Sequence, residues 1–307
     1  MNERELLEAA GRLPKSIEPP RDLWPGIEAR LGRGRSRRWY WVALAAAAVI
    51  ALVVVNTKSD GWKVTWLAGA GPGTVRVGQW IETDASSRAL IAVGHIGQVE
   101  VRPRTRIQLV ALRADNHRLA LAHGAIEAKV DTVPRIFFVE TPVGTAVDLG
   151  CAYTLEMDSL GNGLLHVTAG EVAFQSRDYE ARVPMGAIVL THAGAGPGIP
   201  YVEDAPETLR RALDSLDVKR VLALARPDDA ISLWHLLRRV DQAQRGAVYD
   251  RLASLVPPPA GVSRAAALAL DSAALDAYWT HIHRILFRKV ILRGVRDIDP
   301  RTGTRVR

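Results

Sequence analysis

Short runs of alternating apolar and polar residues, separated by glycines, fill the chain from Val64 to about Val202. A period of two is typical of strands with one buried face. The expected strands are Thr74–Thr83, Arg88–His95, Gln98–Val101, Arg106–Ala111, Arg118–Ala122, Ala125–Val130, Leu164–Thr168, Glu171–Gln175, Ala181–Val183 and Ala187–Thr191. Gly124 is expected as a turn or bulge between two of them. Since no helical pattern interrupts these runs, residues 60–204 predict an all-β domain, either a sandwich or a solenoid.

The segment Arg135–Met157, RIFFVETPVGTAVDLGCAYTLEM, predicts further strands on either side of a turn. Thr141-Pro142-Val143-Gly144 combines a fixed backbone angle with a permissive one. This segment resembles the signature of the FecR domain, which is found in membrane-anchored regulators and anti-sigma factors. Cys151 stands where that family usually has Thr. The resemblance extends over roughly residues 75–190 and implies an extracytoplasmic sensor domain.

Trp39–Val55 is an uncharged run of 17 residues, WYWVALAAAAVIALVVV. It predicts a single transmembrane helix of roughly 25 Å, at the short end for a bilayer core. A buried helix and a cleaved signal peptide are the alternatives. Four arginines among residues 33–38 precede the run, so residues 1–38 are expected in the cytoplasm and residues from about 59 onward outside it. The expected location is the inner membrane, with the later domains periplasmic.

Helical spacing replaces the strand pattern after Ala205. Pro206 begins a run with leucines three to four residues apart, and Asp228 or Asp229 is expected to cap a second helix. Asp271 is expected to cap a longer helix. The resulting fold class is multi-domain α+β, with a helical domain at 205–292 and a basic tail at 293–307. The formal charge of +7 lies at the two ends, because residues 39–204 carry 13 basic against 16 acidic residues. A solvated tail or a tail that touches phosphates or anionic lipids both fit this distribution.

Residues 1–38 contain one sizeable apolar patch, formed by Leu23, Trp24, Ile27 and Leu31 at near-helical spacing. The surrounding run Pro20–Leu31 resembles a segment that precedes the membrane helix in many anti-sigma factors. This resemblance implies an extracytoplasmic-function sigma factor as the cytoplasmic partner, bound by that patch. The same patch could instead lie on the inner membrane surface, helped by the arginines.

The sequence contains no pattern that indicates catalysis. It has no HExxH, CxxC or GxSxG motif, and His281 and His283 are two residues apart on a predicted helix, so they cannot chelate one ion together. Glu140 is expected to be structural because no partner carboxylate is evident, and His235 is expected on a helix face. With the lone Cys151, no internal disulfide can form. We therefore expect no enzyme activity, no cofactor and no metal site.

Two functional hypotheses remain. The first is a single-pass signalling regulator with a FecR-like sensor domain, acting as an anti-sigma factor. The second is an envelope scaffold or ligand-binding module that recognises a protein or glycan outside the cytoplasm, without control of a sigma factor. Neither involves direct binding of nucleic acid. The short 38-residue cytoplasmic segment weighs against the first, because a stable interface buries roughly 800 Å² per partner.

Overall fold

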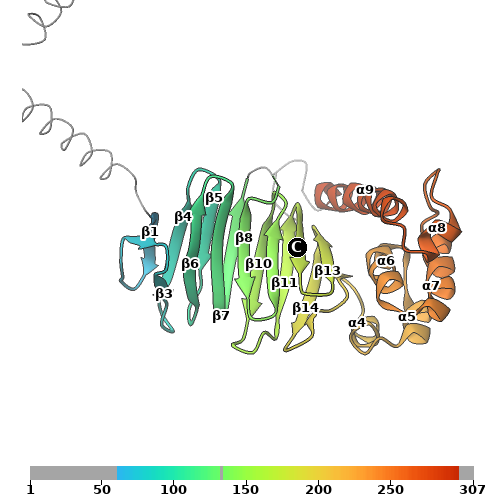
Figure 1. Ribbon diagram of the computed structural model, residues 1–307, viewed down its shortest axis with the longest axis horizontal. Helices are drawn as coiled ribbons and strands as arrows, with labels where there is room; N and C mark the ends of the chain where they lie inside the picture. Colours follow the sequence, from blue (N-terminus) through green and yellow to red (C-terminus); the bar gives the residue numbers. More distant parts are fainter. Residues whose placement is uncertain (1–60, 132–133, 297–307) are drawn as a thin grey trace, which may run out of the picture. The chain divides into compact units, whose positions relative to one another are not determined.

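The computed structural model describes residues 61–131 and 134–296, which lie within one compact unit (Figure 1). The strands are β1 (Gly61–Ala68), β2 (Thr74–Arg76), β3 (Trp80–Glu82), β4 (Arg88–Val93), β5 (Gly97–Val101), β6 (Arg106–Arg113), β7 (Asn116–Val130), β8 (Phe137–Thr141), β9 (Gly144–Asp148), β10 (Ala152–Met157), β11 (Gly163–Ala169), β12 (Glu171–Gln175), β13 (Glu180–Pro184), β14 (Ala187–His192), β15 (Gly196–Pro197) and β16 (Tyr201–Val202). The helical elements follow as α4 (Glu207–Asp214), α5 (Val218–Leu224), the 3-10 turn η1 (Pro227–Asp229), α6 (Ala230–Arg239), α7 (Gln242–Leu255), α8 (Arg264–Leu268) and α9 (Ser272–Arg296).

The long strand β7 belongs to both halves of the 16-stranded sheet, because it pairs with different strands along its length. Its first half pairs with β6 in antiparallel and with β8 in parallel orientation. Its second half pairs with β5 and β10. From β7, one half of the sheet continues through β8, β9, β12 and β13, and the other half continues through β10, β11 and β14. Buried side chains from both halves of β7, Leu119 and Leu121 on one and Ile126 and Ala128 on the other, belong to the same apolar core.

Gly124 is the point at which β7 changes partners. The sequence predicts a break there, with strands on either side, but the structure has one continuous strand. The backbone of Gly124 has φ +99°, and an added Cβ would lie 2.4 Å from the Cα of Thr105. The Thr105 hydroxyl accepts a hydrogen bond from the Ala125 N–H (2.9 Å). Since the close approach at Gly124 is with backbone, it cannot relax through a side-chain rotation.

We expect Gly124→Ala to lower the free energy of unfolding by at least about 2 kcal/mol, because the substitution adds backbone strain and a clash. Gly78→Ala is the matched control, since Gly78 also has a positive φ (+86°) but faces open space. Its cost should be about 1 kcal/mol. Urea denaturation of both variants measures the difference, and equal losses would show that the close approach of Thr105 to Gly124 does not matter.

Aspartate and serine side chains begin several helices of the C-terminal part. Asp217 accepts the Arg220 N–H, Asp241 the Gln244 N–H and Ser263 the Ala266 N–H. The predicted cap of the last helix is confirmed, because the Asp271 carboxylate accepts the Ala274 N–H at 2.8 Å. Asp229 occupies the position before α6, but its carboxylate instead accepts hydrogen bonds from Arg226. The capping side chains satisfy N–H groups that a helix cannot satisfy internally.

The helices share one apolar core with the strands. The same cluster of buried residues includes Phe174 and Val183 from the sheet, and Leu233, Trp234 and Trp279 from α6 and α9. The structure thus corrects the predicted fold class of a multi-domain α+β chain with a transmembrane helix. The described residues form a mostly β structure with a C-terminal helical part, because the last strands leave apolar surface that the helices bury.

No helix within residues 61–131 and 134–296 is long and apolar enough to cross a membrane. The predicted transmembrane segment Trp39–Val55 lies outside these residues.

Candidate functional site

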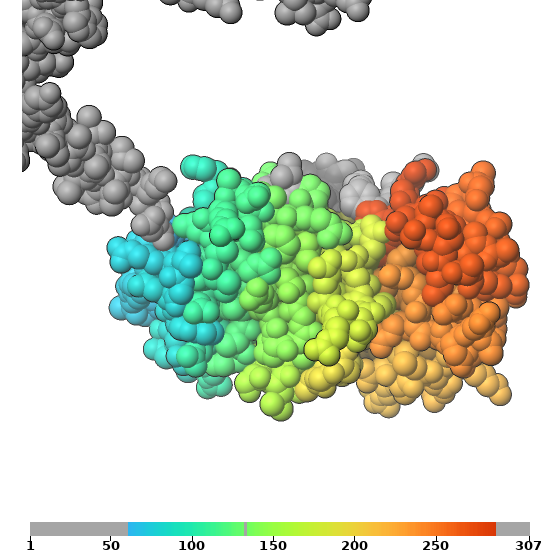
Figure 2. Space-filling view, viewed as in Figure 1, coloured from blue at the N-terminus to red at the C-terminus, as the bar shows by residue number. Residues whose placement is uncertain are grey.

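The helical part meets the sheet at several strands, among them β12, β13 and β16. In the space-filling view, the orange and red helical residues lie directly against the yellow strands (Figure 2). β13 is the edge strand of its half of the sheet, so no further strand pairs with the backbone groups on its outer side. An edge of this kind is a template for unwanted pairing unless something covers it. Here side chains of α6 do so, because His235 contacts the Arg182 carbonyl and Arg238 donates to the Glu180 carbonyl.

His235 is the fully buried polar centre of this junction. Its Nε2 lies 2.9 Å from the Arg182 carbonyl oxygen, which can only accept, so Nε2 carries the proton. Its Nδ1 then accepts from the Tyr179 hydroxyl at 2.6 Å. Burial lowers the pKa of His235 to about 3, so the imidazole is neutral at physiological pH. The ring also makes edge-on contacts with Trp234 and Trp279. His235 therefore connects the β12–β13 hairpin to two helices.

Glu171 and Arg182 extend the junction toward α9. The Arg182 Nε donates to the Glu171 carboxylate at 2.7 Å, and the Trp279 indole N–H donates to the same carboxylate at 3.2 Å. The Arg182 guanidinium lies 4.9 Å from the Trp279 ring centroid and 3.4 Å from the Asp276 carboxylate. The guanidinium fork of Arg182 is thus occupied by two acids. Its role is to join the sheet to α9.

A groove of about 980 Å³ opens beside this network, and we call it the junction groove. Its size lies at the upper end of ordinary ligand sites. Its walls come from the loops around β8 and β9, from the β12–β13 hairpin, and from α6 and the start of α9. The lining residues are Arg135, Leu149, Gln175, Ser176, Arg177, Asp178, Tyr179, Glu180, Arg182, Trp234, Arg238, Leu270, Ser272, Leu275, Asp276 and Thr280. Arg135 and Leu149 belong to the segment that resembles the FecR signature.

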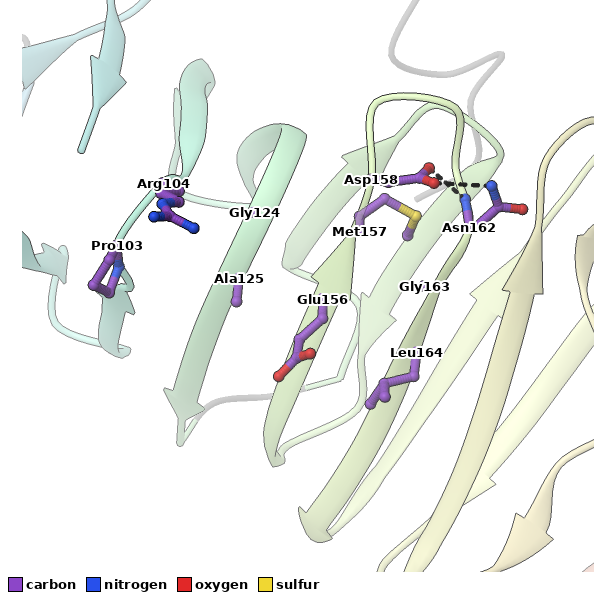
Figure 3. Close-up of a pocket in the computed structure, with 10 residues that line it drawn as sticks. All are labelled: Pro103, Arg104, Gly124, Ala125, Glu156, Met157, Asp158, Asn162, Gly163 and Leu164. Carbon is purple, nitrogen blue, oxygen red and sulfur yellow. Dashed lines mark hydrogen bonds between the residues drawn. The ribbon is translucent and has the colours of Figure 1, made fainter. Parts of the chain in front are cut away.

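A smaller hollow of about 360 Å³ lies between β7, β10 and β11 (Figure 3). Two of its polar residues, Asp158 and Asn162, already bond to each other. The Asp158 carboxylate accepts from the Leu160 and Asn162 N–H groups (2.9 and 2.8 Å) and from the Asn162 side chain (2.9 Å). These hydrogen bonds, led by the one from the Asn162 side chain, lower the pKa of Asp158. The hollow is therefore a stabilised turn and a weaker candidate than the junction groove.

Asp148, Cys151 and Tyr153 form a second buried polar group, between β9 and β10. The Asp148 Oδ1 accepts the Gly150 N–H at 2.6 Å, while its Oδ2 has no hydrogen-bond partner among the described residues. Burial raises the pKa of Asp148 to about 6. Burial also raises the pKa of the Cys151 thiol far above its ordinary range, so Cys151 is a core residue and not a reactive thiolate.

The predicted partner-binding residues Leu23, Trp24, Ile27 and Leu31 lie outside the described residues, and so does the tail beyond 296. Glu140 forms an ion pair with Arg118 at 2.9 Å, in line with its predicted structural role. His235 does lie on a helix, but the prediction missed its complete burial and its bond to Tyr179. Within residues 61–131 and 134–296, no group of three or more His, Cys, Asp or Glu side chains could hold a metal ion.

No family model and no curated protein matches this chain. Among solved structures, two crystal structures titled "putative anti-sigma factor", from Parabacteroides distasonis ATCC 8503, are similar to it. One is 15% identical with a TM-score of 0.37, and the match covers 47% of this chain and 74% of that one. The other is 13% identical with a TM-score of 0.37, over 47% and 75% of the two chains. At this TM-score the likeness carries no argument, and the relation to the FecR domain stays a resemblance.

Proposed function

We propose that this chain is a signalling regulator of the anti-sigma type. In this proposal, the unit from residue 60 onward receives a signal by binding a partner in the junction groove. The observation that carries it is the position of Arg135 and Leu149, which come from the FecR-like segment and line that groove. The segment that implies a regulator thus also lines a groove whose size suits a ligand.

The sigma factor would be held by Leu23, Trp24, Ile27 and Leu31. In the sequence, these apolar residues recur at near-helical spacing within residues 1–38. Helices that dock in a partner's groove do so through apolar positions at this spacing, and Trp is a frequent centre of binding energy. The location of the later residues outside the cytoplasm stays a prediction. An alkaline phosphatase fusion after Arg307 tests it, because an inactive fusion would contradict export.

We expect Trp24→Ala in the full chain to weaken binding of a sigma factor by about 2 kcal/mol, or roughly 30-fold, because it removes the largest apolar side chain of the patch. Co-purification with the sigma factors of the protein's own host, followed by titration of the captured one, measures this loss. Ile17→Ala, in the same segment but outside the patch, is the control and should bind as the unaltered chain does.

The second candidate, an envelope binding module without sigma-factor control, is favoured by the junction groove alone. If the full chain and the peptide of residues 1–38 both retain no sigma factor, while the unit from residue 60 captures an envelope protein, the binding module replaces the regulator. Catalytic activity is not part of either proposal.

A further inference from the structure

We propose that the junction groove binds a peptide segment of a partner protein that carries carboxylate side chains next to apolar ones. Arg135, Arg177 and Arg238 would contact the carboxylates. This inference rests on the proposed function in one respect, namely that a partner binds in the junction groove. The argument from charge and geometry is independent of any sigma factor.

Arg238 is held in position for such a contact. Its guanidinium lies over the Trp234 ring, 4.7 Å from the centroid, and 5.9 Å from that of Tyr179. When a guanidinium stacks on an aromatic ring, its N–H groups point outward, parallel to the ring. In this position they can form two hydrogen bonds with one carboxylate. The protein partner of those donors is the Glu180 carbonyl at 3.5 Å, which is a long contact. Arg238 thus retains donors for a ligand.

Arg135 and Arg177 add positive charge to the same groove. Neither forms an ion pair with an acid among the described residues, and Arg177 lies exposed at the β12–β13 turn. Of the three acids that line the groove, Asp276 pairs with Arg182, and Glu180 accepts a hydrogen bond from the neutral Gln175 amide at 2.6 Å. Glu180 and Asp178 are in no described ion pair, so three arginines outside any described ion pair face two such carboxylates, and the lining keeps an excess of positive charge. This balance favours an anionic ligand.

The aromatic rings of the groove argue for a peptide over an acidic glycan. Sugar rings bind proteins largely by stacking their C–H faces on open aromatic rings. Here Arg238 covers Trp234, and Arg239 lies 4.5 Å from the Tyr179 ring centroid. The groove instead offers apolar side chains from Leu149, Leu270 and Leu275. Arginines interspersed with leucines suit an extended segment in which acidic and apolar side chains alternate.

The test uses the full chain and a fluorescein-labelled peptide, Glu-Leu-Glu-Leu-Glu-Leu, followed by fluorescence anisotropy. We expect saturable binding that weakens as salt is added. Replacing each Glu of the peptide by Gln should weaken it at least 10-fold. Arg177→Ala/Arg238→Ala should cause a similar loss, whereas Arg76→Ala/Arg106→Ala, two exposed arginines on β2 and at the start of β6, should change nothing.

Arg238 also packs on Trp234, so the double variant could fail to fold. Arg177→Glu covers that case, because Arg177 is exposed at a turn and its replacement should reduce binding of the same peptide at least 10-fold. Equal binding by Arg177→Glu and the unaltered chain would overturn the proposal. Absence of binding, or binding of hexagalacturonate in preference to the peptide, would overturn it too. Sigma-factor capture through residues 1–38 would be unaffected by any of these results, so failure here is distinct from failure of the proposed function.

Discussion

His235→Ala is expected to lower the free energy of unfolding by roughly 3–5 kcal/mol. The substitution leaves the Tyr179 hydroxyl and the Arg182 carbonyl without their shared partner. Each buried polar group left unpaired costs about 1–3 kcal/mol. The lost ring also opens a cavity between Trp234 and Trp279, and large-to-small changes in a core add a cost of their own. Urea denaturation followed by tryptophan fluorescence measures the loss, because both indoles contact His235.

Two variants separate the junction's hydrogen bonds from a general effect of removing a histidine. His281→Ala, on α9 and only partly buried, should change the free energy of unfolding by less than about 0.5 kcal/mol. Tyr179→Phe removes the hydroxyl and keeps the ring, so it should cost about 1–3 kcal/mol. If His235→Ala were as mild as the His281 control, His235 would not connect the sheet and the helices.

Several strands were predictable because apolar and polar residues alternate along them, as in Arg88–His95, which is found as β4. The prediction missed β1, and the expected strand Thr74–Thr83 is divided into β2 and β3. The division of β7 at Gly124 was wrong for a physical reason. Glycine there does not end the strand but lets the backbone take a positive φ while the strand changes partners. Local patterning cannot distinguish these two uses of glycine, since the difference lies in the close approach of Thr105, which comes from the turn before β6.

Helices were predictable in proportion to their length. The Asp271 cap and the long apolar spacing after it correctly located α9, whereas the short helices α5 and α8 were missed. The sharing of one core by strands and helices could not be foreseen. It depends on Trp234 and Trp279 meeting the last strands, and an apolar helical stripe fits a separate bundle as well as a sheet edge.

The candidate site was largely beyond prediction from sequence. The junction groove combines Arg135, Arg177, Arg238 and Asp276, which come from four separate segments and share no local motif. The one available signal was Arg135, since it begins the segment that resembles the FecR signature. The burial of His235 was hidden for the same reason, because its partners Tyr179 and Arg182 are more than 50 residues away.

Asp148 and His235 should affect the pH dependence of stability in opposite directions. The pKa of Asp148 is raised from 3.8 to about 6 on folding, so the folded state holds the proton more tightly, and its contribution is lost as pH rises from about 4 to 6. The pKa of His235 is lowered from 6.5 to about 3, so its contribution is present above pH 6.5 and is lost as pH falls below that value. Between pH 4 and 6 the contributions of these two groups to the free energy of unfolding therefore oppose each other.

Asp148→Asn removes one of these two opposing contributions and is expected to make the profile steep. Asn keeps an oxygen that can accept the Gly150 N–H, but it does not titrate. The free energy of unfolding of the variant, relative to the unaltered chain, should therefore rise by about 3 kcal/mol between pH 4 and pH 7, because a tenfold change in proton affinity corresponds to about 1.4 kcal/mol. Urea denaturation of both proteins at intervals across this range measures the difference.

Asp178→Asn, at an exposed turn, is the matched control and should follow the unaltered chain. A difference that stays constant from pH 4 to pH 7 would mean that Asp148 is ionised in the folded protein throughout, because only a carboxyl group that gains its proton on folding makes the two curves diverge as pH rises.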